Sequence, residues 1–229
     1  MEIEEISINS KEYPEKLKNI YDPPSKLYVL GNKGLLHQKG IAIVGARKAT
    51  QYGREVAYKI SKELAENGIN IISGLAIGID ACAHLGAIQA ESITQNIIQQ
   101  SISKIGKTIA VLGGGINNIY PKENIKLARE IIKSGGCIIS EYPLNSKPEK
   151  LHFPQRNRII SALSDGVLVV EASKTSGALI TAEFALEQGK DVFAIPGDIT
   201  REQSKGCNEL IKDGAILITS SQEIQDIIN

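Results

Sequence analysis

The stretch Lys150-Leu-His-Phe-Pro-Gln-Arg-Asn-Arg-Ile-Ile-Ser-Ala-Leu-Ser-Asp-Gly-Val-Leu-Val-Val-Glu171 contains a helix signal followed at once by a strand signal. Proline fixes its own φ and disfavours the αR region for the residue before it, so we expect the helix to begin after Pro154, near Gln155 or Arg156, and to end at about Ser164. Apolar residues at 159, 160 and 163 give that helix one buried stripe. The run Gly166–Val170 is typical of a strand that is buried on both faces of a parallel sheet.

Cations gather at the start of this stretch. Lys147, Lys150, Arg156 and Arg158 face only one nearby carboxylate, Glu149, in a chain whose formal net charge is zero. We expect Arg156 to lie in the first turn of the helix, where the macrodipole is already positive, and a bound anion would compensate both charges. A solvated surface cluster explains the same composition about equally well, so the pattern alone leaves both interpretations open.

The remainder of the chain alternates apolar strands with amphipathic helices, which predicts an α/β fold with a parallel sheet and helices on both faces. We expect residues 1–38 to form a lead-in that packs on the sheet and residues 39–229 to form the main domain. The strands are expected at Lys26–Leu30, Ile41–Val44, Ile69–Ile72, Lys107–Leu112, Cys137–Ile139, Val167–Val170, Asp191–Ile195 and Ile216–Ile218. The helices are expected at Tyr52–Asn67, from about Asp80, at Lys122–Lys133, Ala178–Gln188, Asn208–Lys212 and from Ser221.

Composition excludes several classes of protein. The hydrophobic share of 42% and charged share of 23% are those of a soluble globular protein. Three well-separated cysteines without ligand spacing predict neither disulfides nor a zinc site, and we expect no metal and no cofactor. No apolar run is long enough for a signal peptide or a membrane span, so we expect a cytoplasmic protein that makes no membrane contact. Zero net charge argues against wholesale wrapping of nucleic acid but is compatible with a basic groove.

Small residues follow the predicted strands. Because the carboxyl ends of parallel strands share one edge of the sheet, these residues should gather there and offer N–H groups and hydroxyls to an anion. They are Gly45, Ser73, Gly74, Gly113, Gly114, Gly115, Ser140, Ser176 and Gly177. Neither GxGxxG nor GxxxxGK[ST] is present, so a dinucleotide site and a P-loop are not supported.

Asp80 and His84 stand four residues apart on one helix face. A catalytic dyad is conceivable, but a helix N-cap at Asp80 and a packed or hydrogen-bonded His84 are the more favoured interpretation. Ser176 is expected to cap the helix that follows it, and a phosphate contact there is compatible with that role.

Taken together, the motifs resemble the DNA-processing protein A family (DprA, also called Smf) over about residues 10–218. The segments that carry the resemblance are Ile41-Ala-Ile-Val-Gly-Ala-Arg47, Ser73-Gly-Leu-Ala-Ile-Gly-Ile-Asp-Ala-Cys-Ala-His84, Gly113-Gly-Gly-Ile-Asn-Asn-Ile-Tyr-Pro-Lys-Glu-Asn124, Ser140-Glu-Tyr-Pro143, Phe153-Pro-Gln-Arg-Asn-Arg158, Ser176-Gly-Ala-Leu-Ile-Thr-Ala-Glu183, Pro196-Gly197 and Gly206-Cys-Asn208.

The resemblance implies an extended Rossmann-like domain that binds single-stranded DNA without enzymatic activity. In that family the protein protects incoming DNA in natural transformation, loads the RecA recombinase and forms a homodimer. The contacts expected in this chain are Gly45, Arg47, Ser73, Gly74, Gly113, Gly114, Lys150, Phe153, Arg156, Asn157, Arg158, Ser176 and Gly177.

Three departures from the family pattern limit this expectation. Ala46 stands where a Ser or Thr is usual, which removes one hydroxyl that could contact a phosphate. The sequence shows neither an N-terminal SAM-like domain nor a C-terminal winged-helix domain, so their roles are not carried over. An insertion at about residues 91–105 has a helical stripe of isoleucines, which we expect to extend the preceding helix and to be buried on the domain or on a partner.

Two other functions stay open at this point. One is a nucleotide-processing Rossmann enzyme of the lysine-decarboxylase-like, cytokinin-activating type, although Ser176–Glu183 lacks the paired glycines of its Pro-Gly-Gly-x-Gly-Thr turn. The other is a recruitment scaffold that binds recombinase but little DNA.

Overall fold

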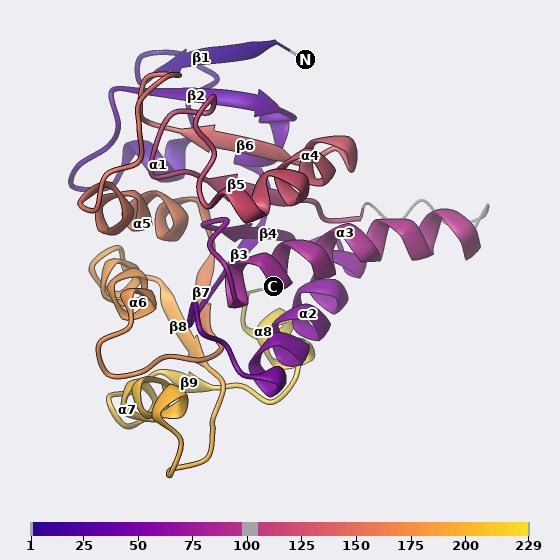
Figure 1. Cartoon of the computed structure of the whole chain (residues 1–229), viewed down its shortest axis with the longest axis vertical. Helices are drawn as coiled ribbons and strands as arrows, with labels where there is room; N and C mark the ends of the chain where they lie inside the picture. Colours follow the sequence, from indigo (N-terminus) through magenta and orange to yellow (C-terminus); the bar gives the residue numbers. More distant parts are fainter. Residues whose placement is uncertain (1, 98–104, 229) are drawn as a thin grey trace.

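A computed structural model describes residues 2–97 and 105–228 of the chain, without the side chains of residues 91–97. Within this part, one sheet of nine strands has the order β1-β2-β6-β5-β4-β3-β7-β8-β9 (Figure 1). Every pair from β6 to β9 is parallel, which confirms the predicted α/β fold with a parallel, Rossmann-like sheet. The strands are β1 (Ile3–Ser7), β2 (Lys26–Gly31), β3 (Gly40–Val44), β4 (Asn70–Ser73), β5 (Thr108–Val111), β6 (Cys137–Ser140), β7 (Gly166–Val169), β8 (Asp191–Ala194) and β9 (Ile216–Leu217).

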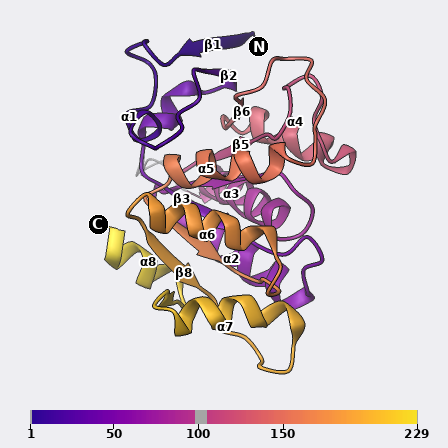
Figure 2. The same cartoon turned by 90° about the vertical axis from the view of Figure 1, so that its left-hand side faces the viewer.

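Helices cover both faces of the sheet. One layer, stacked towards the viewer in Figure 2, consists of α1 (Glu15–Lys18), α5 (His152–Leu163), α6 (Gly177–Glu187) and α7 (Lys205–Lys212). The opposite layer consists of α2 (Gln51–Glu66), α3 (Ile79–Ile97), α4 (Ile125–Lys133) and α8 (Ser221–Ile228). Three short 3-10 turns, η1 (Lys33–His37), η2 (Lys122–Asn124) and η3 (Glu202–Ser204), complete the described elements.

Strand β3 shows why its sequence is apolar throughout. Ile41 and Ile43 pack into the core beneath α2 and α3, whereas Ala42 and Val44 pack into the core beneath α5 and α6. Side chains of a strand alternate between the faces, so a strand with helices on both sides needs an apolar residue at every position. The order of the sheet reverses between β3 and β7, and open α/β sheets bind ligands at such a switch point.

The N-terminal segment adds two antiparallel strands to one edge of this sheet. β1 pairs with β2, and β2 pairs with β6, so residues before β3 contribute directly to the sheet. The division into a lead-in of residues 1–38 and a domain of residues 39–229 stays a prediction.

Two predicted helix starts were wrong. α5 begins at His152 rather than near Gln155, because Pro154 lies in the first turn, where the N–H that proline lacks would have no helical partner. α7 begins at Lys205 rather than Asn208, directly after the η3 turn. There Gly206 packs so close to the Ala172 carbonyl that a larger residue would not fit.

The insertion extends the preceding helix as expected, since α3 runs to Ile97. The expected burial of its stripe at residues 93, 97, 98 and 102 lies outside what the structure describes. Ile105, the last member of the stripe, is partly buried against the core formed by α2 and α3.

A buried carboxylate lies at the N-terminus of α2 and binds its N-cap residue. Glu171, 4% exposed, accepts hydrogen bonds from the Thr50 amide (2.9 Å) and the Thr50 hydroxyl (2.5 Å). A carboxylate at this position complements the positive end of the helix dipole, and here the chain supplies it from the end of β7. The first helix after β3 therefore has an internal anion where nucleotide-binding folds place a phosphate.

Gly53→Ala is expected to lower the free energy of unfolding by about 1–3 kcal/mol, because the added methyl group would overlap the pinned Glu171 carboxylate. Urea denaturation measures this. Gly177→Ala is the matched control: its methyl group meets nothing within 4 Å, so stability should be unchanged or slightly higher. Equal stability for both variants would contradict the fixed position of Glu171.

Candidate functional site

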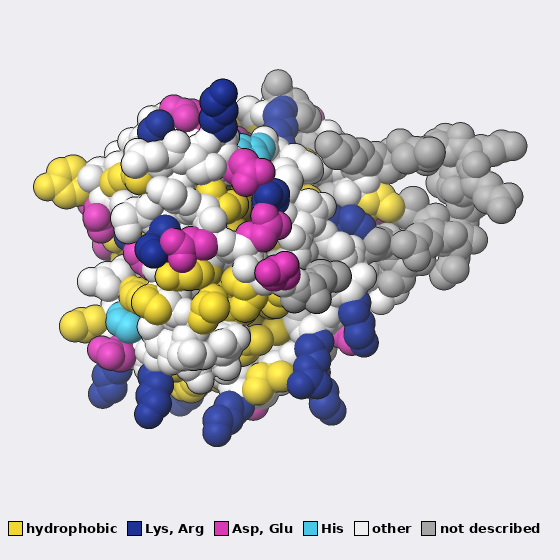
Figure 3. Space-filling model, turned by 90° about the horizontal axis from the view of Figure 1, so that it is seen from above, with side chains coloured by type: hydrophobic (Ala, Val, Ile, Leu, Met, Phe, Trp, Pro, Cys, Tyr) yellow, Lys and Arg dark blue, Asp and Glu magenta, His cyan; other side chains and the backbone are white. Residues whose placement is uncertain are grey.

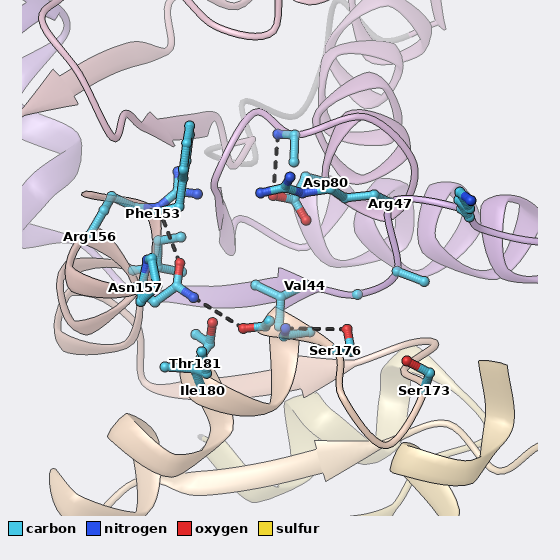
Figure 4. Close-up of a pocket in the computed structure, with 18 of the residues that line it drawn as sticks. Val44, Arg47, Asp80, Phe153, Arg156, Asn157, Ser173, Ser176, Ile180 and Thr181 are labelled. Atoms are coloured by element: carbon cyan, nitrogen blue, oxygen red, sulfur yellow. Dashed lines mark hydrogen bonds between the residues drawn. The ribbon is translucent and has the colours of Figure 1, made fainter. Parts of the chain in front are cut away.

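A cleft of about 820 Å³ opens at the switch point between β3 and β7 (Figure 4). The end of β3 and the following loop form one wall, and the first turns of α5 and α6 form the other. These elements bring together residues that lie more than 100 positions apart in the sequence, as the geometry of parallel strands predicts. The lining residues that the sequence singled out are Gly45, Arg47, Lys150, Phe153, Arg156, Asn157, Ser176 and Gly177.

Arg47, Lys150 and Arg156 share this concavity, as expected from the sequence. The guanidinium of Arg47 lies 5.5 Å from the centre of the Phe153 ring, a cation–π distance. The arrangement places the positive charge of one wall against an aromatic face of the other. Such a cleft suits a ligand that carries both phosphates and planar bases.

Arg156 forms the floor of the cleft rather than a free arm. It lies in the second turn of α5, not the first, and is only 5% exposed. Its guanidinium donates to the Gly74 carbonyl (2.7 Å) and to the Val111 carbonyl, and its Nε donates to Asn157 Oδ1 (3.2 Å). Burial lowers the pKa of Arg156 to about 10, so it stays charged at neutral pH. The positive charge is therefore fixed by the ends of β4 and β5 and oriented before any ligand arrives.

Asp80 provides the buried counter-charge. Its carboxylate accepts hydrogen bonds from the Gly74 amide (3.1 Å) and the Ala76 amide (3.3 Å), and it lines the cleft. Asp80 was expected as the N-cap of α3, but the helix begins at Ile79, and the carboxylate instead holds the loop from β4. Burial raises the pKa of Asp80, and the positive charges of Arg156 and Arg47 oppose that rise.

His84 is a buried, neutral side chain, as the favoured interpretation of the sequence proposed. The Thr108 hydroxyl donates to the Ile71 carbonyl (2.9 Å), so it accepts from Nδ1–H of His84 (2.6 Å). Nε2 has no partner among the described residues. Burial lowers the pKa of His84 to about 3, and the residue does not line the cleft, so this arrangement provides no catalytic dyad there.

The pKa of His84 makes stability depend on pH. Between pH 6.5 and about 3 the unfolded chain binds a proton at this residue and the folded chain does not, so the free energy of unfolding should fall as pH falls. At pH 5, His84 alone should lower the free energy of unfolding by about 2 kcal/mol relative to neutral pH. Urea denaturation between pH 7 and 5 should show a shallower slope for His84→Gln, whereas the exposed control His37→Gln should keep the wild-type slope. Parallel curves for all three proteins would contradict the neutral, buried state.

Five of the expected contacts do not line the cleft. Ser73 is fully buried and donates its hydroxyl to the Ile43 carbonyl (2.6 Å), and Gly74 lies beneath the Arg156 guanidinium. Gly113 lies against the Phe153 ring and Gly114 against Pro148, so both glycines allow the chain to pack closely instead of exposing amides. The pattern of small residues after strands thus reflects packing at these four positions.

Arg158 is the fifth expected contact that does not line the cleft, and carboxylates already neutralise its positive charge. Both terminal nitrogens donate to the Glu141 carboxylate at 2.7 Å, and Nε lies 3.2 Å from an Asp22 carboxylate oxygen. The side chain is 10% exposed and faces away from the cleft, towards the N-terminal segment. The surplus of cations seen in the sequence is therefore smaller at the cleft than the composition suggests.

The N-terminus of α6 lines the same wall as α5. The Ser176 hydroxyl accepts from the Ala178 amide (3.4 Å), which confirms the predicted cap. Asn157 donates to the Gly177 carbonyl (3.2 Å) and links α5 to α6 within this wall. In Figure 4 Asn157 lies at the left of the view, and Ser176 lies lower and to its right.

Several lining residues were missed from the sequence. The most informative is Tyr120, which is 49% exposed and has its ring 5.7 Å from that of Phe153. Its position in the loop after β5, next to Pro121, was the signal that could have found it. Others among the missed residues are Lys48, Ala76, Ser173, Thr181 and Glu202.

Fold and cleft together define an open α/β sheet protein with a positively charged, aromatic-lined site at the strand ends. The chain belongs to the DNA recombination-mediator protein A family, whose model matches residues 4–229. The DNA processing protein DprA of Bacillus subtilis is 45% identical over 223 residues, which cover 97% of this chain and 70% of that protein.

Two solved structures extend the comparison. The structure of DNA processing protein A from Streptococcus pneumoniae has a TM-score of 0.87 at 42% identity and covers 98% of this chain and 74% of that one. DNA processing protein A from Helicobacter pylori, solved to describe its binding mode for single-stranded DNA, has a TM-score of 0.82 at 32% identity. That match covers 99% of this chain and 95% of the other.

Two further observations bear on metals and membranes. No group of three His, Cys, Asp or Glu side chains in the described ranges is placed to hold a metal ion. None of the helices described is long and apolar enough to cross a bilayer. The three cysteines are free thiols, with Cys137 and Cys207 buried.

Proposed function

We propose that this protein binds single-stranded DNA in the cleft at the switch point, without reading its sequence. The observation that carries the proposal is the convergence of Arg47, Lys150 and Arg156 beside the Phe153 and Tyr120 rings in one concavity. The Helicobacter pylori relative, whose structure concerns single-stranded DNA binding, supports it.

The two kinds of lining residue suit the two parts of a nucleotide. Cations neutralise backbone phosphates and release counterions, which gives affinity for any sequence and weakens with salt. Aromatic faces stack on any base. Arg156, held on the floor by backbone carbonyls, adds fixed charge, whereas Arg47 and Lys150 reach the ligand from the walls.

We further propose a non-enzymatic role: the protein protects incoming single strands in natural transformation and loads RecA on them, as a cytoplasmic homodimer. The family membership supports this role. The location of the Glu171 carboxylate argues against the alternative of a nucleotide-processing enzyme, because it occupies the helix N-terminus that would otherwise attract a nucleotide phosphate.

An anisotropy titration with short single-stranded oligonucleotides at two salt concentrations tests the proposal. We expect binding to several unrelated sequences with similar affinity, and a slope of log K against log salt of about −2, from about three phosphate contacts. Absence of binding would contradict it. Release of free base from a nucleoside monophosphate would instead support the enzymatic alternative.

A further inference from the structure

A stripe of cations runs along the outer face of α4. Lys126, Arg129 and Lys133 are all exposed, while the opposite face of the helix buries Leu127, Ala128 and Ile131. At 100° per residue the three cations fall within an arc of about 60° and span about 10 Å along the axis. The helix thus presents one narrow positive edge to solvent.

Two of the three cations in this stripe are not neutralised by their own helix. Among the described residues, only Lys133 has an acidic partner, Glu130 at 2.9 Å, and neither Lys126 nor Arg129 has an ion pair. The two carboxylates of residues 122–133, Glu123 and Glu130, lie to one side of the stripe rather than within it.

Helix α2 provides the contrast within the same molecule. There Lys59 is paired with Glu63 and Lys62 with Glu66, each four residues further on. That spacing is typical of a solvated helix surface. In α4 Lys126 also stands four residues before Glu130, but Glu130 pairs with Lys133 instead, so Lys126 and Arg129 have no ion pair among the described residues. Simple solvation therefore explains the face of α4 less well than it explains that of α2.

The stripe continues from a wall of the cleft. Tyr120 lines the cleft, Pro121 follows, and the exposed Lys122 begins the η2 turn that leads into α4. α4 lies beside α3 in the layer drawn to the right of the sheet in Figure 1. In the view from above, a row of Lys and Arg side chains stands along the lower border of the molecule, and others lie elsewhere on the same face (Figure 3).

We propose that α4 extends the path of the nucleic acid beyond the cleft, with Lys126, Arg129 and Lys133 contacting phosphates of the same single strand that leaves the cleft past Tyr120. This inference rests on the proposed function of the cleft. It predicts a binding site that short oligonucleotides do not fill. Long strands gain affinity from α4, and short ones do not.

The test compares oligothymidylates of about 6 and about 20 nucleotides on the triple variant Lys126→Ala, Arg129→Ala, Lys133→Ala. For the long strand we expect an affinity loss of roughly 10- to 100-fold at about 0.1 M salt. The slope of log K against log salt should become shallower by about 2, since each lost phosphate contact removes about 0.7. The short strand should bind within about twofold of wild type, because the cleft itself is intact.

The control variant Lys18→Ala, Lys59→Ala, Lys212→Ala removes the same charge from exposed positions on other helices and should bind both strands like wild type. Unchanged long-strand affinity in the α4 variant would overturn the inference and leave α4 as a solvated face or a surface for an acidic protein. Equal losses for both strands, or equal losses in the control, would overturn it too. Failure of the wild-type protein to bind either strand would instead contradict the proposed function.

Discussion

Arg156→Ala is expected to lower the free energy of unfolding by about 3–5 kcal/mol, the cost of leaving a buried charge without its partner. The guanidinium is 5% exposed and bonds to carbonyls at the ends of β4 and β5, and Asp80 is buried opposite it. Its removal leaves two carbonyls without their donor and one carboxylate without its cation.

Urea denaturation measures this effect, and Asp80→Asn separates its causes. If the uncompensated carboxylate is the main cost, adding Asp80→Asn to Arg156→Ala should be less damaging than the sum of the single changes. A single variant that unfolds at the wild-type urea concentration would show that Arg156 is a free ligand-binding arm and that the described floor of the cleft is wrong.

Arg47→Ala is expected to weaken binding of single-stranded DNA by roughly tenfold for all sequences alike, and to reduce the salt slope by about 0.7. Arg47 lines the cleft above Phe153 and has no carboxylate ion pair among the described residues, so its loss should affect the ligand more than the fold. Anisotropy titrations at two salt concentrations measure both quantities.

Arg54→Ala is the matched control for this change. Arg54 is an exposed arginine on α2 that does not line the cleft. The Arg54→Ala change should leave the affinity for single-stranded DNA and its salt slope unchanged. If the Arg47 variant bound with an unchanged slope, Arg47 would not contact phosphate.

Most of the sheet could be predicted from the sequence, because a strand that is buried on both faces is a short run of consecutive apolar residues. Ile41–Val44 and Gly166–Val170 are apolar at every position, which only a sheet covered on both faces requires. The predicted start of α5 is too late because proline is tolerated in the first turn of a helix, where Pro154 lies.

The site was predicted less completely because tertiary partners decide what a polar residue does. Arg158 and Arg156 are equivalent in the sequence, yet one pairs with Glu141, 17 residues earlier, and the other spans the ends of two strands. Glu171 gave no sign that it would cap a helix 121 residues earlier. Such contacts depend on the order of strands in the sheet, which local periodicity does not specify.

The glycine-rich turns show the same limit. Gly113 and Gly114 were expected to offer amides to a phosphate, but they allow Phe153 and Pro148 to pack closely. Gly113 therefore helps to position the aromatic ring of the cleft instead of binding the ligand itself.

The central claim is that the strand lies in the cleft against the Phe153 ring. The chain contains no tryptophan, so Phe153→Trp would introduce a fluorescent reporter at that wall. On addition of single-stranded DNA, the tryptophan emission should be quenched by base stacking, saturate together with the anisotropy signal, and recover when salt is raised. DNA binding seen by anisotropy with no change in the tryptophan emission would place the strand elsewhere and contradict the claim.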